Sequence, residues 1–209
     1  MVEAAGLALP YPEVTSIDED SLGEQNLALA MELPERPLVL GGCCCAHVGA
    51  VEALAARHGR IALVWLDAHG DLNTPATSPS GDAWGMPLRM LLEADAIEPE
   101  DTLLIGARQL DPGEEAYLDT HPIRRDIDGL DAALADTEGA YVALDADAIA
   151  PGAIAAFMPE TGGPSLADVE RLFERLRKRT PVLGAGLTGL RPEPANVEPL
   201  TRLCSALGL

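Results

Sequence analysis

The sequence predicts an α/β domain in which helices pack on a mainly parallel sheet. Three observations predict it: short apolar runs alternate with amphipathic stretches, the runs show no polar alternation, and aromatic residues make up only 3% of the chain. Runs without alternation are typical of parallel strands that helices cover on both faces. A length of 209 residues fits one unit, so residues 1–209 are expected to form a single domain.

Apolar runs without charged residues mark the expected strands. In chain order, they cover residues 37–40, 61–66, 102–105, 141–144 and 182–187. The stretches between them have helical character, and strands that alternate with helices form parallel βαβ units with right-handed crossovers.

The clearest helix begins at Ser165, which forms a capping box with Asp168. Its apolar side chains recur on one stripe, as in a helix that packs on a sheet: Leu166, Val169, Leu172, Phe173 and Leu176. Further helices are expected over residues 47–56, 84–94, 113–118 and 128–135, with Gly59 ending the first. The irregular stretch 73–85 is rich in proline and serine, and a loop of that length usually lines a functional site.

Composition excludes several classes of partner. A formal net charge of -20 repels phosphate backbones, which argues against nucleic acid. The longest apolar run, residues 61–66, falls far short of the roughly 20 residues that span a bilayer. The start MVEAAGLALPYPEV lacks the basic segment of a secretion signal, so a cytoplasmic protein without membrane contact is expected. The acidic charge fits either a solvated surface or steering of cationic substrates.

Three consecutive cysteines, Cys43 to Cys45, follow a glycine pair in the segment LGGCCCAHVGA. Neighbouring cysteines cannot normally meet disulfide geometry, and the fourth, Cys204, lies far away, so reduced thiols are expected. A redox device, a metal site and buried core filler all remain open from this segment alone.

Aspartates cluster directly after two of the predicted strands. Asp67, His69 and Asp71 follow residues 61–66, and Asp145 and Asp147 follow residues 141–144. Ligands of open parallel sheets bind at this carboxyl edge, and side chains two residues apart share one side if the backbone stays extended. Four convergent carboxylates repel one another unless cations neutralise them.

Oxygen ligands with one imidazole suit a hard divalent ion, Mn²⁺ before Zn²⁺, and shared carboxylates suit a pair of ions about 3.5 to 4 Å apart with a bridging hydroxide. The alternative is that these aspartates are only turn formers and helix caps.

The segments WLDAHGDLNTPATSPSGDAWGMPL and ALDADAIAP, with LGG before them, resemble the ureohydrolase superfamily of arginase, agmatinase and formimidoylglutamase. The resemblance runs from about Leu40 to Leu209 and identifies the chain as a short, divergent member. It implies a three-layer α/β/α fold with a mainly parallel sheet (arginase-like), two bound Mn²⁺ ions, and hydrolysis of a carbon–nitrogen bond in a small guanidino or amidino substrate. A homo-oligomer is expected as well.

The resemblance also implies roles for the clustered residues. Asp67 and Asp145 would bridge the two metal ions, while His69 and Asp147 would complete one site. Asp71 would lie at the other site, accept a proton from the bridging hydroxide and pass it to the leaving amine. Residues expected outside the metal ligands are Asp111, near the reacting group as a second catalytic candidate, and Asn73, Ser80 and Asp82, which would face the substrate's polar head.

Four features depart from the family pattern. The family's first strand, with its glycine-rich segment, has no counterpart before the first run. Cys44 stands where a ligand histidine is usual, so the second metal site is weak, empty or loaded with another metal. Trp84 replaces a histidine near the pocket, and Thr188 stands where a glutamate normally pairs with the guanidinium, so both are candidate substrate contacts.

Two hypotheses follow from these patterns. The first is a metal-dependent hydrolase of linear amidines that uses a metal-bridging hydroxide. The second is a degenerate, non-catalytic arginase-fold protein that binds metal or a partner as a subunit. His47 supplies the missing imidazole only if its helix begins early, and Cys43 and Cys45 are interpreted as small buried apolar residues.

Overall fold

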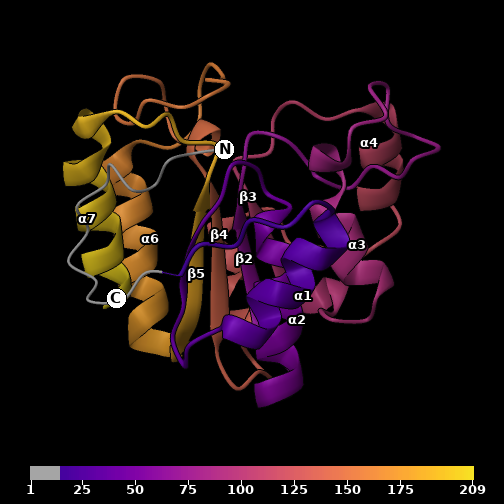
Figure 1. Cartoon of the computed structure of the whole chain (residues 1–209), viewed down its shortest axis with the longest axis horizontal. Helices are drawn as coiled ribbons and strands as arrows, with labels where there is room; N and C mark the ends of the chain where they lie inside the picture. Colours follow the sequence, from indigo (N-terminus) through magenta and orange to yellow (C-terminus); the bar gives the residue numbers. More distant parts are fainter. Residues whose placement is uncertain (1–14) are drawn as a thin grey trace.

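A computed structural model describes residues 15–209 and contains a five-stranded, all-parallel sheet of order β1-β5-β4-β2-β3 (Figure 1). The segment MVEAAGLALPYPEV lies outside the described residues. Each predicted strand is confirmed, since the observed strands are β1 (Leu38–Leu40), β2 (Ala62–Leu66), β3 (Thr102–Ile105), β4 (Ala140–Asp145) and β5 (Val182–Thr188).

The helix that begins after Ser165 is confirmed together with its capping box to Asp168. Two helices that the sequence analysis did not predict, α1 and α7, lie before the first strand and after the last one. The α-helices are α1 (Leu22–Glu32), α2 (Ala46–His58), α3 (Pro87–Glu93), α4 (Pro112–Leu118), α5 (Leu130–Ala133), α6 (Leu166–Arg179) and α7 (Val197–Leu207). Short 3₁₀ turns occupy Ala83–Gly85, Pro99–Asp101, Ile127–Gly129, Ala146–Ala148 and Pro194–Asn196.

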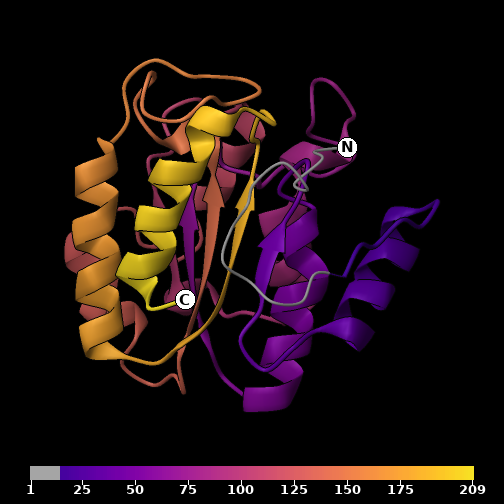
Figure 2. The same ribbon diagram turned by 60° about the vertical axis from the view of Figure 1, so that its left-hand side comes forward.

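The helices form one layer on each face of the sheet, which confirms the three-layer prediction (Figure 2). Alternate residues of β2 serve the two faces: Val64 belongs to the core beneath α5, α6 and α7, while Trp65 belongs to the core beneath α2 and α3. Both cores are apolar, so the strands carry no polar alternation.

Parallel pairing places the carboxyl ends of all the strands along one edge, at the top of Figure 1. Loops that follow β1, β2, β4 and β5 therefore meet where a ligand site is expected. None of the helices within residues 15–209 has both the length and the apolar character needed to cross a membrane.

Candidate metal centre

Asp67 occupies the first position after β2 and is almost fully buried. Its two carboxylate oxygens face different partners. Oδ1 lies 3.3 Å from His69 Nδ1, and Oδ2 lies 3.3 Å from Cys44 Sγ. One aspartate therefore belongs to two groups of ligand-type side chains, each with its ligand atoms within 4.8 Å of one another.

The first group, called the His69 cluster, consists of Asp67, His69 and Asp147. His69 Nδ1 lies 3.1 Å from Asp147 Oδ2, and the Ala68 amide donates to Asp147 Oδ1 at 3.0 Å. Hydrogen bonding to Asp147, and then to Asp67, raises the pKa of His69 to about 10. In the metal-free chain, the imidazolium thus supplies the positive charge between two carboxylates.

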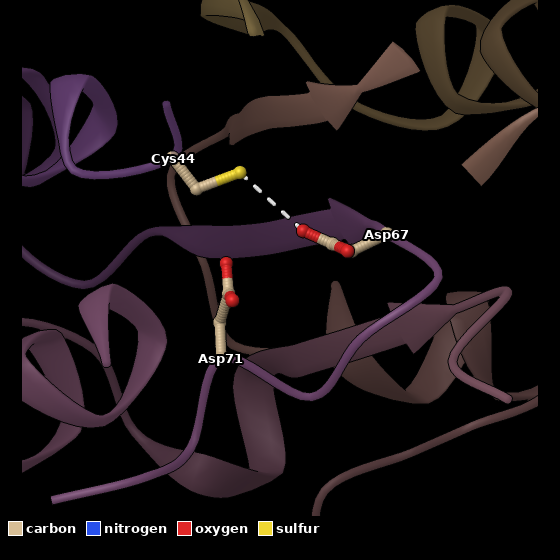
Figure 3. A group of neighbouring side chains, drawn as sticks. All are labelled: Cys44, Asp67 and Asp71. Carbon is tan, nitrogen blue, oxygen red and sulfur yellow. Dashed lines mark hydrogen bonds between the residues drawn. The ribbon is translucent and has the colours of Figure 1, made fainter. Parts of the chain in front are cut away.

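The second group, called the Cys44 cluster, consists of Cys44, Asp67 and Asp71, whose side chains point toward one another (Figure 3). All three are buried, and Asp71 Oδ2 has no hydrogen-bond partner among residues 15–209. Burial raises the pKa of Asp71 well above its usual range, with repulsion from Asp67 next. Burial also raises the pKa of the Cys44 thiol.

The convergence does not use the extended backbone assumed from the spacing of two, and that assumption is wrong. Asp71 has a left-handed φ of 54°, and Asp147 lies in the 3₁₀ turn Ala146–Ala148. Such a φ is costly for a residue with a side chain and is found where the surrounding structure enforces it, often at functional sites. Here the turn directs the Asp71 carboxylate back toward Asp67.

Asp145 ends β4 between the two clusters. Its Oδ1 accepts a hydrogen bond from the Asp147 amide at 3.0 Å, and its Oδ2 lies 3.2 Å from Cys44 Sγ. Burial, followed by repulsion from Asp67, raises the pKa of Asp145 to about 8. It belongs to neither three-residue group as the side chains stand, so its bridging role stays a prediction.

The residues present fit a pair of divalent cations. An unpartnered buried oxygen on Asp71 and raised carboxyl pKa values indicate negative charge that lacks a counter-ion. The donors are carboxylate oxygens with one imidazole and one thiol, a mixture that suits divalent transition ions. Asp67 is placed to serve both positions.

Asn73 and Asp111 form a hydrogen bond beside the two clusters. Asn73 Nδ2 donates to Asp111 Oδ2 at 2.8 Å, which ties the loop after β2 to the start of α4. Glu114 was not predicted as a site residue, but it is buried and accepts hydrogen bonds from the amides of Leu72 and Asp111 at 3.0 and 2.9 Å. Its signal was the capping-box spacing from Asp111 to Glu114.

Arg108 is a second residue that the sequence analysis missed. It donates to the carbonyl oxygens of Asp147 and Glu160, at 2.8 and 3.1 Å, and to those of Gly106, Ala148 and Thr161. These bonds join the loop after β3 to the loop after β4. They fix the backbone that carries Asp147, and no sequence pattern announces them because all the acceptors are main-chain atoms.

The remaining candidates for substrate contact lie in two settings. Ser80, Asp82 and Trp84 are exposed on the loop 73–85, whereas Thr188 is fully buried. The hydroxyl of Thr188 lies 3.2 Å from both Cys44 Sγ and Asp145 Oδ2. Their roles toward a substrate, and that of Asp111 in catalysis, stay predictions.

The other cysteines and His47 lie around the Cys44 cluster. Cys45 is buried and its thiol donates to the Ala83 carbonyl at 3.4 Å, but Cys43 is only partly buried, so its assignment to the core is wrong. Helix α2 begins early, at Ala46, yet His47 joins neither ligand group among the described residues. Its Nε2 lies 3.3 Å from Thr188 Oγ1, behind Cys44.

Comparison with known proteins places the chain in a family. The sequence profile of the Arginase family matches residues 18–206. The chain belongs to the arginase family. It is 36% identical to an arginase of Staphylococcus aureus (strain COL) over 166 residues, which cover 68% of this chain and 54% of the relative. An arginase of Bacillus subtilis (strain 168) is 31% identical over 194 residues, covering 78% of this chain and 66% of the relative.

Among solved structures, this family member resembles the Bacillus subtilis arginase with a TM-score of 0.82 and 28% identity, over 90% of this chain and 78% of that one. The chain spans about half the length of the staphylococcal arginases it matches. Fold and family are thus established.

Proposed function

We propose that this chain is a metal-dependent hydrolase that cleaves a carbon–nitrogen bond of a guanidino or amidino compound, as ureohydrolases do. The observation that carries the proposal is the shared position of Asp67 between two ligand groups at the carboxyl edge of the sheet. Membership of a family whose relatives are named arginase supports the same reaction class.

The His69 cluster and the Cys44 cluster would each hold one divalent cation, with Asp145 joining them as a further shared ligand. Mn²⁺ is the expected ion, although the site at Cys44 would be weak, empty or loaded with another metal. When bound, such a pair polarises the substrate and lowers the pKa of a coordinated water, so that a nucleophile is present at neutral pH.

Asp71 is the residue best suited to move the proton. Its Oδ2 is buried without a partner in the described part of the chain, so it is free to accept a proton at the reacting centre and to deliver it to the departing nitrogen. Glu114 and the Arg89 amide, which donates to the Asp71 carbonyl at 3.0 Å, keep the turn that carries this carboxylate in place.

Asp111 and Asn73 would orient the substrate. Their mutual hydrogen bond fixes the carboxylate and the amide relative to the turn that carries Asp71. A guanidino or amidino group presents several N–H donors, which a carboxylate and an amide oxygen can accept. Ser80, Asp82 and Trp84, on the exposed loop 73–85, would contact the rest of the molecule.

The test is metal analysis of protein purified without chelator, followed by assays of ammonia and urea release from a panel of guanidino and amidino compounds. We expect two divalent ions per chain and turnover of at least one compound, with Asp71→Asn retaining the fold but losing turnover. Bound metal without turnover of any compound would favour the second hypothesis, a non-catalytic metal-binding or partner-binding subunit. Light scattering of the same protein tests the expected homo-oligomer.

A further inference from the structure

A chain of buried polar side chains runs from the core to Cys44. His47 is fully buried on α2, with Nδ1 lying 3.2 Å from the Tyr141 hydroxyl and Nε2 lying 3.3 Å from Thr188 Oγ1. Thr188 Oγ1 in turn lies 3.2 Å from Cys44 Sγ and 3.2 Å from Asp145 Oδ2. The series Tyr141, His47, Thr188 therefore ends on two groups at the metal centre.

The direction in which these side chains donate hydrogen bonds follows from the number of protons available. Within the described residues, the only hydrogen-bond partner of the Tyr141 hydroxyl is His47 Nδ1, so the buried phenol satisfies its proton by donating to that nitrogen. A neutral imidazole then carries its proton on Nε2 and donates it to Thr188 Oγ1. The Thr188 proton is then left for one of its remaining acceptors, which are the Leu144 carbonyl oxygen at 3.4 Å, Asp145 Oδ2 and Cys44 Sγ.

Burial of His47 lowers its pKa to about 3, which agrees with a neutral ring that carries a single proton. The sequence also makes room for the ring. A Cβ on Gly186 of β5 would overlap His47 Nδ1 and lie 2.5 Å from the Tyr141 hydroxyl oxygen. The edge of the ring packs against Trp65 with 5.2 Å between ring centroids, so its orientation is fixed on several sides.

Cys44 has three polar side-chain neighbours in the structure: Asp67, Asp145 and Thr188. An ionised carboxylate can only accept hydrogen bonds, so in the metal-free chain the single thiol proton is directed at one of the two carboxylates. A sulfur that binds a cation releases this proton to solvent and becomes an acceptor. Thr188 Oγ1 is then the neighbour that can donate to it.

We propose that His47 and Thr188 are positioning residues that deliver a hydrogen bond to Cys44 as a thiolate ligand, and so make the Cys44 cluster a site for a thiophilic divalent ion. The inference rests on the proposed function insofar as that function places a cation at the Cys44 cluster. Groups that hydrogen-bond to metal ligands fix the ligand's orientation and typically change metal affinity 10- to 100-fold. Thiolate ligands favour Zn²⁺ and chemically similar ions over Mn²⁺.

Titration of the metal-free full chain with Co²⁺ tests this inference, because a thiolate bound to Co²⁺ gives a charge-transfer absorption band. Thr188→Val removes the hydroxyl at nearly constant volume, and Thr188→Ser is the matched control that keeps it. We expect the band in the wild-type chain and in Thr188→Ser. In Thr188→Val, the band should move and its Co²⁺ affinity should fall by about 10- to 100-fold, while binding at the His69 cluster stays unchanged.

His47→Leu provides a second variant if Thr188→Val does not fold by circular dichroism, and the same weakening is expected because no side-chain donor at this position then reaches Thr188 Oγ1. A folded variant whose charge-transfer band has the wild-type position, and whose Co²⁺ affinity equals that of the wild type, would overturn the inference. So would two bound Co²⁺ ions without any thiolate band, although that result leaves the proposed function intact. A wild-type chain that binds no Co²⁺ would overturn the proposed function and this inference together.

Discussion

The His69 cluster and the Cys44 cluster share Asp67 but balance its charge in different ways. His69 has a side chain that is 35% exposed, and it lies within 3.3 Å of Asp67 and 3.1 Å of Asp147. Cys44, by contrast, is a buried neutral thiol, and Asp71 beside it keeps an unpartnered oxygen. The His69 cluster contains its own cation, whereas the Cys44 cluster depends on bound protons or on a metal.

This difference shows how a metal site and a folded core coexist. A buried carboxylate without a counter-charge is costly, so it keeps its proton until a cation replaces that proton. In the His69 cluster, a metal ion must compete with an imidazolium that already pairs with both carboxylates. In the Cys44 cluster, it must displace protons from sulfur and oxygen.

The largest effect is expected for the residue common to both clusters. Asp67→Asn removes the negative charge that both sites share. It replaces one carboxylate oxygen by an N–H donor that faces either His69 or Cys44, so one site loses its ligand atom and the other keeps only a neutral amide oxygen. Calorimetric titration should show metal binding weakened by more than the 10- to 100-fold typical of residues outside the coordination shell. His69→Asn is the matched control and should weaken only one of two binding events. A tight site that survives unchanged in Asp67→Asn would show that the clusters do not share this ligand.

The next effect concerns the stability of the metal-free chain, measured in chelator. Because the pKa of Asp145 is raised to about 8, the folded state holds this proton more tightly than the unfolded state does. The stabilisation is complete below about pH 4, the usual carboxyl pKa, and is lost as the pH rises toward 8. Asp145→Asn should therefore be more stable than wild type at pH 8 by on the order of a few kcal/mol, with little difference near pH 4.

Other groups change the absolute slope, so the comparison is made between the two chains. The raised pKa of His69, about 10, also makes the folded state less stable as the pH rises, as the raised pKa of Asp145 does. The lowered pKa of Cys43, about 6, has the opposite effect on stability. Urea unfolding of both chains across this pH range gives the difference.

Asp145→Asn combined with Asp147→Asn should also abolish metal binding, but its stability gain is smaller because Asp147 pairs with His69. A less stable Asp145→Asn at pH 8 would mean that Asp145 acts as a helix cap.

A smaller effect is expected on substrate choice. The resemblance to the family implies that Thr188 takes the place of a carboxylate that pairs with a guanidinium, and its hydroxyl already lies near His47, Cys44 and Asp145. Loss of a charge-assisted hydrogen bond of about 1.5 to 3 kcal/mol should weaken arginine by roughly one to two orders of magnitude. Steady-state assays with Mn²⁺ should give arginine a kcat/KM below roughly 10⁴ M⁻¹s⁻¹. A higher value would mean that another group supplies the charge.

The smallest effect is the difference in affinity between the two clusters for Mn²⁺. The His69 cluster offers only oxygen and nitrogen ligands, which suit this ion better than the thiol of Cys44. We expect two binding events in calorimetry, with the His69 cluster tighter by about 10-fold, equivalent to about 1.4 kcal/mol. Equal affinities, or an ion found only beside Cys44, would reverse the comparison.

The sequence by itself determined the strands and the edge that carries the site. Apolar runs without alternation predicted every strand found within residues 15–209, because a parallel sheet buries both faces. Placement of Asp67 and Asp145 at strand ends predicted where ligands gather. Helices α1 and α7 were not predicted, although the sequence contains signals for both. Ser21 and Glu24 form a capping box, and Leu200, Leu203 and Leu207 repeat with helical spacing.

Only the tertiary structure decided how the ligand groups close. The turn that reverses Asp71 has a left-handed backbone that no local pattern requires, because neighbouring elements enforce it. The direction of His47 depends on the rotation of α2 against β5 and on the space that Gly186 leaves there. The sequence predicts which residues lie at the edge of the sheet, but contacts between helices and strands determine which of their atoms face one another. For that reason, the sequence identified Cys44 as a ligand candidate, while only the fold placed Thr188 and His47 behind it.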